Sequence, residues 1–226
     1  MSRNSNSASL RIFAILTAVV SLMTIAPEAR AQAADTITVG TVTGSGVVDV
    51  PVFIRDTAGT PLGIDQPAGS RIQSYSIRVT YAPTSAVQSI SFSRAGITAP
   101  LTPTFESSPA LPGSISLLGN FAEATNLIPF TSNLAAPGNQ VAHLLVTIVP
   151  GTAPGTIIHL TLDPVLTQLT DEGGTPATLE TEANGRLILA SGAVTVAAAP
   201  AAVPSLSTWA VLLLAAALCA VVLLRI

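Results

Sequence analysis

Residues 74–81 read SYSIRVTY, and they carry the clearest strand pattern in the chain. Large apolar or aromatic side chains alternate with small, polar or charged ones along the whole segment. A period of two is the pattern of a β-strand that buries one of its two faces. We therefore expect a buried set and an outer set: Tyr75, Ile77, Val79 and Tyr81 in a core, and Ser74, Ser76, Arg78 and Thr80 outside.

Similar segments flank this strand and are separated by turns rich in Gly and Pro. We expect strands at 37–39, 48–55, 87–93, 102–107, 114–121, 141–149, 156–162 and 186–196. Pro51 indicates an edge position for its strand, whereas 141–149 and 156–162 are apolar on both faces, as central strands often are. No stretch from Asp35 to Val196 has a helical period. Residues 35–196 are therefore predicted to be all-β, a jelly-roll-type β-sandwich of about nine strands.

The N-terminus has the pattern of a secretory signal peptide. A polar start with Arg3 and Arg11 precedes an apolar run at 12–25 that is too short for an ordinary membrane span. Ala29 and Ala31 then provide the small-x-small cleavage pattern, with Ala31-Gln32-Ala33 as a second option. We predict a signal peptide at 1–31; the alternative is a short N-terminal anchor.

The C-terminus ends in a long apolar run. Residues 203–226 read VPSLSTWAVLLLAAALCAVVLLRI and carry one charge, Arg225. This length suffices to cross a bilayer, so we predict a transmembrane helix joined by an Ala/Pro linker at 197–202; a buried core helix is the alternative. The only cysteine, Cys219, lies in this helix, so the domain must be stabilised by its core without a disulfide.

The start of this tail resembles the IPTL-CTERM sorting signal, a relative of PEP-CTERM. The residues that carry the resemblance are Val203, Pro204, Ser205, Leu206 and Trp209. The family usually ends in a basic cluster, where this chain has only Arg225. The resemblance implies export across a bacterial inner membrane, anchoring by the C-terminal helix, an exosortase-type processing enzyme as partner, and delivery to the cell surface or extracellular matrix.

The order of strands in the domain resembles that of a cohesin. The opening segments 39–42 and 48–52 are similar, and so is 77–83, where Ala82 replaces the Asp of a Tyr-Asp-Pro ending. Segments 113–117, 144–148, 155–160 and 184–189 resemble later strands. This resemblance implies a nine-stranded jelly roll related to the family-2 and family-3 carbohydrate-binding modules. It also implies docking through one sheet face, as cohesins bind dockerins.

The sequence offers little for catalysis, so we predict no enzyme, no catalytic residue and no cofactor. His143 and His159 stand in strand patterns and are expected to be structural or surface residues. Asp163, Asp171, Glu172, Glu180 and Glu182 could surround Ca²⁺, but their spread favours solvated loop charges and no metal site. Five arginines against eleven acidic residues in 35–196 give a net charge of −6, which argues against nucleic acid as a partner.

The candidate binding face is formed by outward residues of two strands expected to share a sheet. Its residues are Ser74, Ser76, Arg78, Ser116 and Leu118, flanked by Ser114 and Asn120. We expect a flat, mostly neutral patch with Arg78 as its only charge and Leu118 as its main apolar group; the alternative is an ordinary solvated sheet face.

The expected ligand of this face is a dockerin-like protein or matrix component. The alternative is a carbohydrate-binding module that takes an extracellular polysaccharide. The only tryptophan is Trp209 in the tail, and Tyr75 and Tyr81 point inward by the strand pattern. Sugar platforms rely on exposed aromatic rings, so this distribution disfavours the alternative.

Overall fold

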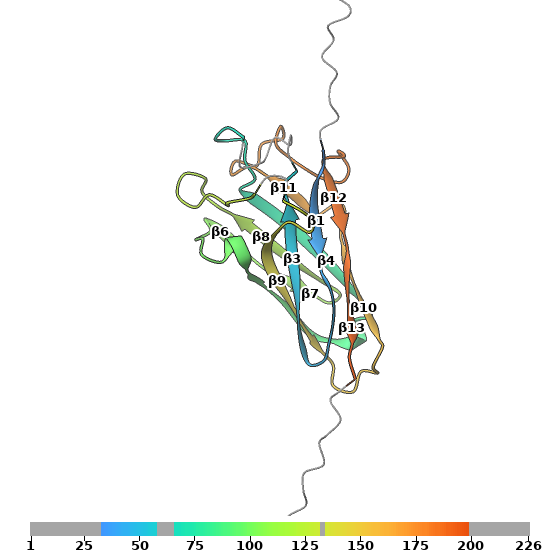
Figure 1. Ribbon diagram of the computed structural model, residues 1–226. Helices are drawn as coiled ribbons and strands as arrows, with labels where there is room; N and C mark the ends of the chain where they lie inside the picture. The colour runs from blue at the N-terminus through green and yellow to red at the C-terminus, as the bar shows by residue number, and fades with distance from the viewer. Residues whose placement is uncertain (1–32, 58–65, 132–133, 199–226) are drawn as a thin grey trace, which may run out of the picture.

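The computed structural model describes residues 33–57, 66–131 and 134–198, which form two β-sheets packed face to face (Figure 1). The five-stranded sheet has the order β12 (Leu187–Ala190), β1 (Asp35–Val39), β3 (Val47–Arg55), β9 (Asn139–Ile148), β5 (Val87–Arg94). The main path of the other sheet is β2 (Thr41–Gly44), β13 (Gly192–Val196), β10 (Ile157–Leu162), β4 (Ser74–Ala82), β8 (Ser114–Asn120), β6 (Phe105–Ser107). Two more strands complete the eight: β11 (Gln168–Thr170) on β4 and β7 (Ala110–Leu111) on β8.

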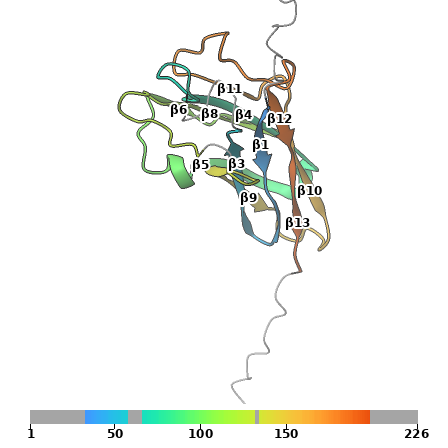
Figure 2. The ribbon, with the colours of Figure 1, turned by 45° about the horizontal axis from the view of Figure 1, so that its top comes forward.

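The prediction of an all-β sandwich is confirmed. Helical structure within the described ranges is limited to two 3₁₀ turns, Thr84–Ala86 and Gly96–Thr98. Figure 2 shows the layers, with β4, β8 and β6 above β3, β5 and β9. The predicted strand at 186–196 is divided between β12 and β13, and short strands β2, β7 and β11 were not expected.

The core lies between the sheets and follows the predicted phase of β4. Tyr75, Ile77 and Val79 are at most 2% exposed, while Tyr81 is half-buried at the edge of the core. The Tyr75 ring packs on Phe121 with centroids 6.0 Å apart. The sandwich therefore stands on its own apolar interior, and β4 presents its other face to solvent.

One side of the sandwich is closed by strands that change sheets. The chain passes from β1 to β2 through Gly40, and from β12 to β13 through Ser191. β1 and β2 pair in parallel with β12 and β13 respectively, so the two crossings lie side by side. The opposite side is open, because β5 and β6 are sheet edges that do not pair with each other.

One prediction about strand position was wrong. Pro51 lies in β3, which pairs with both β1 and β9 and is not an edge strand. Gly40 N–H donates to the Pro51 carbonyl at 2.8 Å, at the point where β1 leaves the sheet. Pro51 has no N–H to donate, but an N–H at this position would point toward the place where β1 ends. No hydrogen bond of the β1–β3 ladder is therefore lost.

The central position expected for 141–149 and 156–162 is confirmed. Both are interior strands of their sheets. In β10, however, the alternate residues Ile157, His159 and Thr161 are exposed, and the outward side chains of β9 are partly exposed. Each sheet packs on the core with one face and meets solvent with the other.

Several predicted segments lie outside the described residues. These are the signal peptide with Ala29 and Ala31, and the tail with Val203, Pro204, Ser205, Leu206 and Trp209. Within the three described ranges, no helix is long and apolar enough to cross a membrane. The described chain begins and ends at opposite ends of the sandwich (Figure 1).

Candidate docking face

The five residues of the candidate face come together on the outer surface of the eight-stranded sheet. β4 and β8 pair in antiparallel register, with Ser76 opposite Leu118 and Arg78 opposite Ser116. Ser74 lies opposite Asn120 at the end of the same ladder. Directly opposite residues of a sheet project from the same face, so these side chains form one continuous surface.

Arg78 covers part of this surface. Its guanidinium donates hydrogen bonds to Ser114 Oγ at 2.8 Å and to Ser116 Oγ at 3.5 Å. The two serines are only 6% and 7% exposed, so the expectation that they stand open to solvent was wrong. Among the described residues Arg78 has no carboxylate partner. Its positive charge is held in a fixed orientation and remains available to a binding partner.

A loop beside Arg78 presents two apolar side chains. β10 and β11 both pair with β4, and residues 163–167 bulge out between them. Asp163 Oδ1 accepts the N–H groups of Val165 and Leu166 at 2.9 and 3.0 Å, which fixes the turn. Ser76 Oγ donates to the Leu166 carbonyl at 2.8 Å, so the loop is tied to the candidate face. Val165 and Leu166 are 79% and 47% exposed.

The face is hollowed where a flat patch was expected. A depression of about 290 Å³ lies over β4, β8, β6 and β11. It is lined by Ser74, Tyr75, Ser76, Phe105, Leu118, Gly119, Asn120, Gln168 and Thr170. Phe105 is 55% exposed and Leu118 is half-buried, so Phe105 replaces Leu118 as the main apolar group. Burial raises the pKa of the Tyr75 phenol, which therefore stays neutral beneath the hollow.

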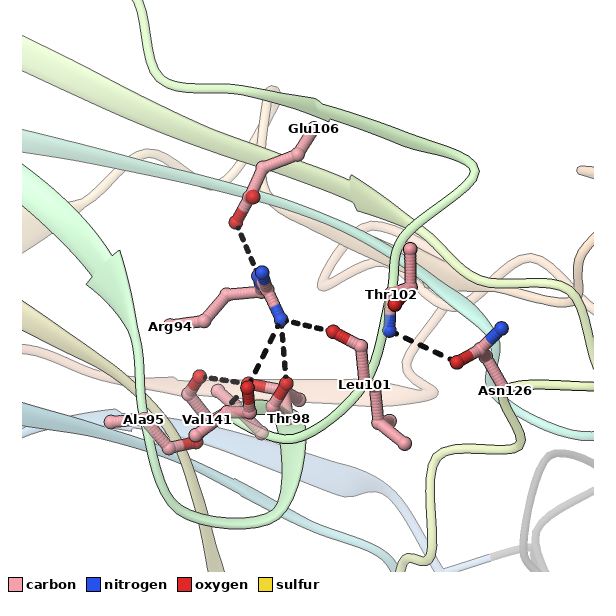
Figure 3. Close-up of polar contacts among 9 residues, drawn as sticks. Arg94, Ala95, Thr98, Leu101, Thr102, Glu106, Asn126 and Val141 are labelled. Carbon is pink, nitrogen blue, oxygen red and sulfur yellow. Dashed lines mark hydrogen bonds and ion pairs between the residues drawn. The ribbon is translucent and has the colours of Figure 1, made fainter.

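Arg94 holds the segment that carries Phe105. Figure 3 shows its guanidinium bridging Glu106 of β6, at 2.9 Å, and the carbonyl of Thr98, at 2.8 Å. Thr98 Oγ1 in turn donates to the Val141 carbonyl of β9 at 2.6 Å. Thr102 N–H donates to Asn126 Oδ1 at 2.9 Å and fixes the approach to β6 (Figure 3). These contacts connect the two sheets at their open side and set the position of Phe105.

Sequence reasoning missed Phe105, Gln168 and the loop at 163–167. Phe105 stood in a predicted strand, but only its pairing opposite Asn120 places it on the outer face. Gln168 reaches the face because β11 pairs with β4, with Gln168 opposite Ser76. Nothing in the local sequence signals either pairing.

The histidines and acidic residues do not gather at this face. His143 lies on the five-stranded sheet and contacts Asp49, whereas His159 is exposed on β10 of the other sheet. The expectation of solvated loop acids was wrong for Asp171 and Glu180, which are 4% and 0% exposed. Within the described part of the chain, no group of three or more His, Cys, Asp or Glu is arranged to hold a metal ion.

Solved structures with a similar fold are cohesin domains. The sixth cohesin of scaffoldin B from Acetivibrio cellulolyticus, in complex with a Cel5 dockerin, has a TM-score of 0.50 at 18% identity and covers 72% of this chain and 99% of the cohesin. The third cohesin of ScaC from the same organism, in complex with the ScaB dockerin, has a TM-score of 0.50 at 16% identity, over 73% and 99%.

The structural likeness establishes a cohesin-like β-sandwich fold. No protein-family model and no curated protein matches the sequence.

Proposed function

We propose that this chain docks a partner protein, of the dockerin-like class, on the outer face of its eight-stranded sheet. One observation carries the proposal. Seven large hydrophobic side chains are exposed in the described part of the chain, and five belong to this sheet or its loops: Phe105, Leu111, Ile157, Val165 and Leu166. Exposed apolar groups on the same sheet as an oriented arginine have the composition of an interface.

The likeness to cohesins solved with dockerins supports the choice of partner class. We assign no catalytic role to the domain, since the polar side chains of the face serve to orient Arg78 and the loop at 163–167. Apolar contact and an oriented charge are the two features of this face that would serve to recognise a partner protein.

Substitutions on the face are expected to abolish docking without unfolding the domain. Phe105→Ala combined with Arg78→Glu removes the exposed ring and reverses the charge, and each hot-spot loss typically costs at least tenfold in affinity. Partners recovered from the native envelope are measured by pull-down and titration. Ile188→Ala, equally exposed at 54% but on the five-stranded sheet, is the matched control.

The proposal fails if the double variant retains its partners while its melting temperature is unchanged. A matching loss in the Ile188→Ala control would also contradict it, because the docking would then involve the other sheet.

A polysaccharide is the second candidate ligand of the same hollow. Phe105 offers one exposed ring, and Asn120 and Gln168 offer amide groups beside it. A sugar can stack on such a ring and hydrogen-bond to the amides. Glycan binding that survives Arg78→Glu but is lost in Phe105→Ala would favour this candidate over a protein.

Export and anchoring belong to the same proposal. We infer that residues 1–31 direct secretion and that 203–226 hold the protein in the membrane until an exosortase-type enzyme processes the tail. The mature chain is expected to begin at Gln32, and deletion of 203–226 is expected to release a folded β domain. N-terminal sequencing and circular dichroism test both points. An envelope protein that still begins at Met1, or a truncated one that loses its β signal, would refute this.

A further inference from the structure

The five-stranded sheet ends in a long edge that lacks the usual protection. Natural edge strands are shortened, charged, interrupted by proline or covered, because their free backbone groups attract other strands. β5 has eight residues, VQSISFSR, without proline and with no charge before Arg94. The other edges are shorter: β12 and β2 have four residues each, and β6 has three. β5 stands at the open side of the sandwich, opposite β12 (Figure 2).

The hydrogen-bonding pattern identifies the free backbone groups of β5. Ile148 N–H donates to Gly46 O on the β3 side of β9, whereas Val141 O accepts from Ala95 on the β5 side. Alternate residues of an interior strand face opposite neighbours, so the odd-numbered residues of β9 from His143 to Thr147 bond to β5. Their partners are Ser89, Ser91 and Ser93. The N–H and C=O groups of Ile90 and Phe92 therefore point away from β9, within the plane of the sheet and toward its open edge.

The side chains along this edge leave room for another strand. Ser89, Ser91 and Ser93 are exposed on the outer face, while Ile90 and Phe92 are each 9% exposed on the inner face. A hollow of about 520 Å³ lies beside the end of β5 and is lined in part by Phe92, Arg94, Glu106 and Leu117. Arg94 and Glu106 neutralise each other there at 2.9 Å. No net charge repels an approaching chain.

We propose that β5 pairs antiparallel with β5 of a second copy, across a two-fold axis at Ser91, to join two five-stranded sheets into one. The sequence of the edge is self-complementary in this register. Ile90 of each copy lies opposite Phe92 of the other, so the outward backbone groups exchange hydrogen bonds and apolar meets apolar on the inner face. Ser89 lies opposite Ser93 and Arg94 opposite Gln88, so no like charges meet. A two-fold contact of this kind closes on itself, since it uses the β5 edge of both copies and leaves only the four-residue strand β12 at each end of the joined sheet.

Disulfide trapping in the full-length chain, extracted in mild detergent, tests the register. Cys219→Ala removes the only cysteine, and Ser91→Cys then introduces one at the axis. Facing residues of a non-hydrogen-bonded pair have Cα atoms about 4.5 Å apart, within reach of a disulfide. We expect cross-linked dimers to form at least about tenfold faster than in Ser93→Cys, which is also exposed but lies opposite Ser89 in the other copy.

Two outcomes of the cross-linking experiment would overturn the proposal. The first is equal cross-linking rates for Ser91→Cys and Ser93→Cys, which would indicate random collision. The second is a Ser91→Cys chain that links to a different protein and not to itself. In an independent measurement, light scattering is expected to show a dimer at high concentration for the unmodified chain and a monomer for Ser91→Lys. A mass that is monomeric in both also refutes the pairing.

Discussion

Replacement of Glu180 with glutamine is expected to stabilise the domain at neutral and alkaline pH. Glu180 is fully buried, and its carboxyl group lies beside that of Asp35. Asp35 and Asp56 are also fully buried. They are the chain neighbours of Thr36 and Arg55, which lie opposite each other in β1 and β3. Burial, reinforced by the negative charge of Asp35 and by contact with its carboxyl group, raises the pKa of Glu180 to about 10.

The direction of the pH effect follows from this raised pKa. Between the unfolded value of 4.5 and the folded value, the folded chain holds a proton that the unfolded chain has released. Stability from this group is therefore fully present below pH 4.5 and is lost as the pH rises toward 10, by up to about 1.4 kcal/mol per pH unit. Glutamine keeps the shape of the Glu180 side chain and offers an N–H donor to Asp35, but its amide does not ionise in this pH range.

Denaturant unfolding at a series of pH values measures this effect. We expect Glu180→Gln to match the unmodified protein near pH 4 and to exceed its free energy of unfolding by about 2 kcal/mol or more at pH 8. Glu182→Gln is the control, since Glu182 is two residues away and exposed. A difference between Glu180→Gln and the unmodified protein that does not grow with pH would show that Glu180 is ionised in the fold.

The extent to which sequence predicted this structure depends on how local each signal is. The alternation of residues 74–81 placed Tyr75 and Ile77 in the core correctly, because a period of two is a property of one strand. Burial of Glu180 depends on a bridge to Leu169 and on proximity to Asp35, distant in sequence. No local pattern distinguishes this acid from Glu182 beside it, so solvent exposure was the natural expectation.

The candidate face likewise combines features that a single strand predicts with features that arise from contacts between distant segments. The outward phase of β4 and of β8 could be read from each strand, and their shared sheet followed from the resemblance to cohesins. The hollow could not be predicted, since it arises where β6 and β11 meet β8 and β4 from separate parts of the chain. Arg78 was expected on the outer face, but its hydrogen bonds to two serines of the neighbouring strand could not be predicted from either strand alone.

Gly192→Ala is expected to destabilise the domain strongly, because Gly192 lies where the sheet-changing strands cross. A Cβ atom at this position would stand 2.1 Å from Gly40 O and 2.5 Å from Val39 O. Both are backbone atoms, so no side-chain rotation relieves the clash, and the crossings from β1 to β2 and from β12 to β13 must separate. Overpacking of this kind typically costs about 1–3 kcal/mol and sometimes more; with two carbonyl oxygens so near, we expect the upper end, about 3 kcal/mol.

Thermal and denaturant unfolding of Gly192→Ala, with Gly173→Ala as control, provides the test. A Cβ at Gly173 would meet its nearest atoms at 3.7 and 3.8 Å, which is ordinary contact, so that variant should unfold within about 1 kcal/mol of the unmodified protein or be slightly more stable. Because β13 and β10 belong to the eight-stranded sheet and β12 and β1 to the five-stranded sheet, separation at Gly192 should weaken both sheets together. Hydrogen exchange should then increase in β1 and β10 alike. Equal stability of the two alanine variants would mean that the crossings can move apart at no cost, and that the closed side of the sandwich does not depend on this contact.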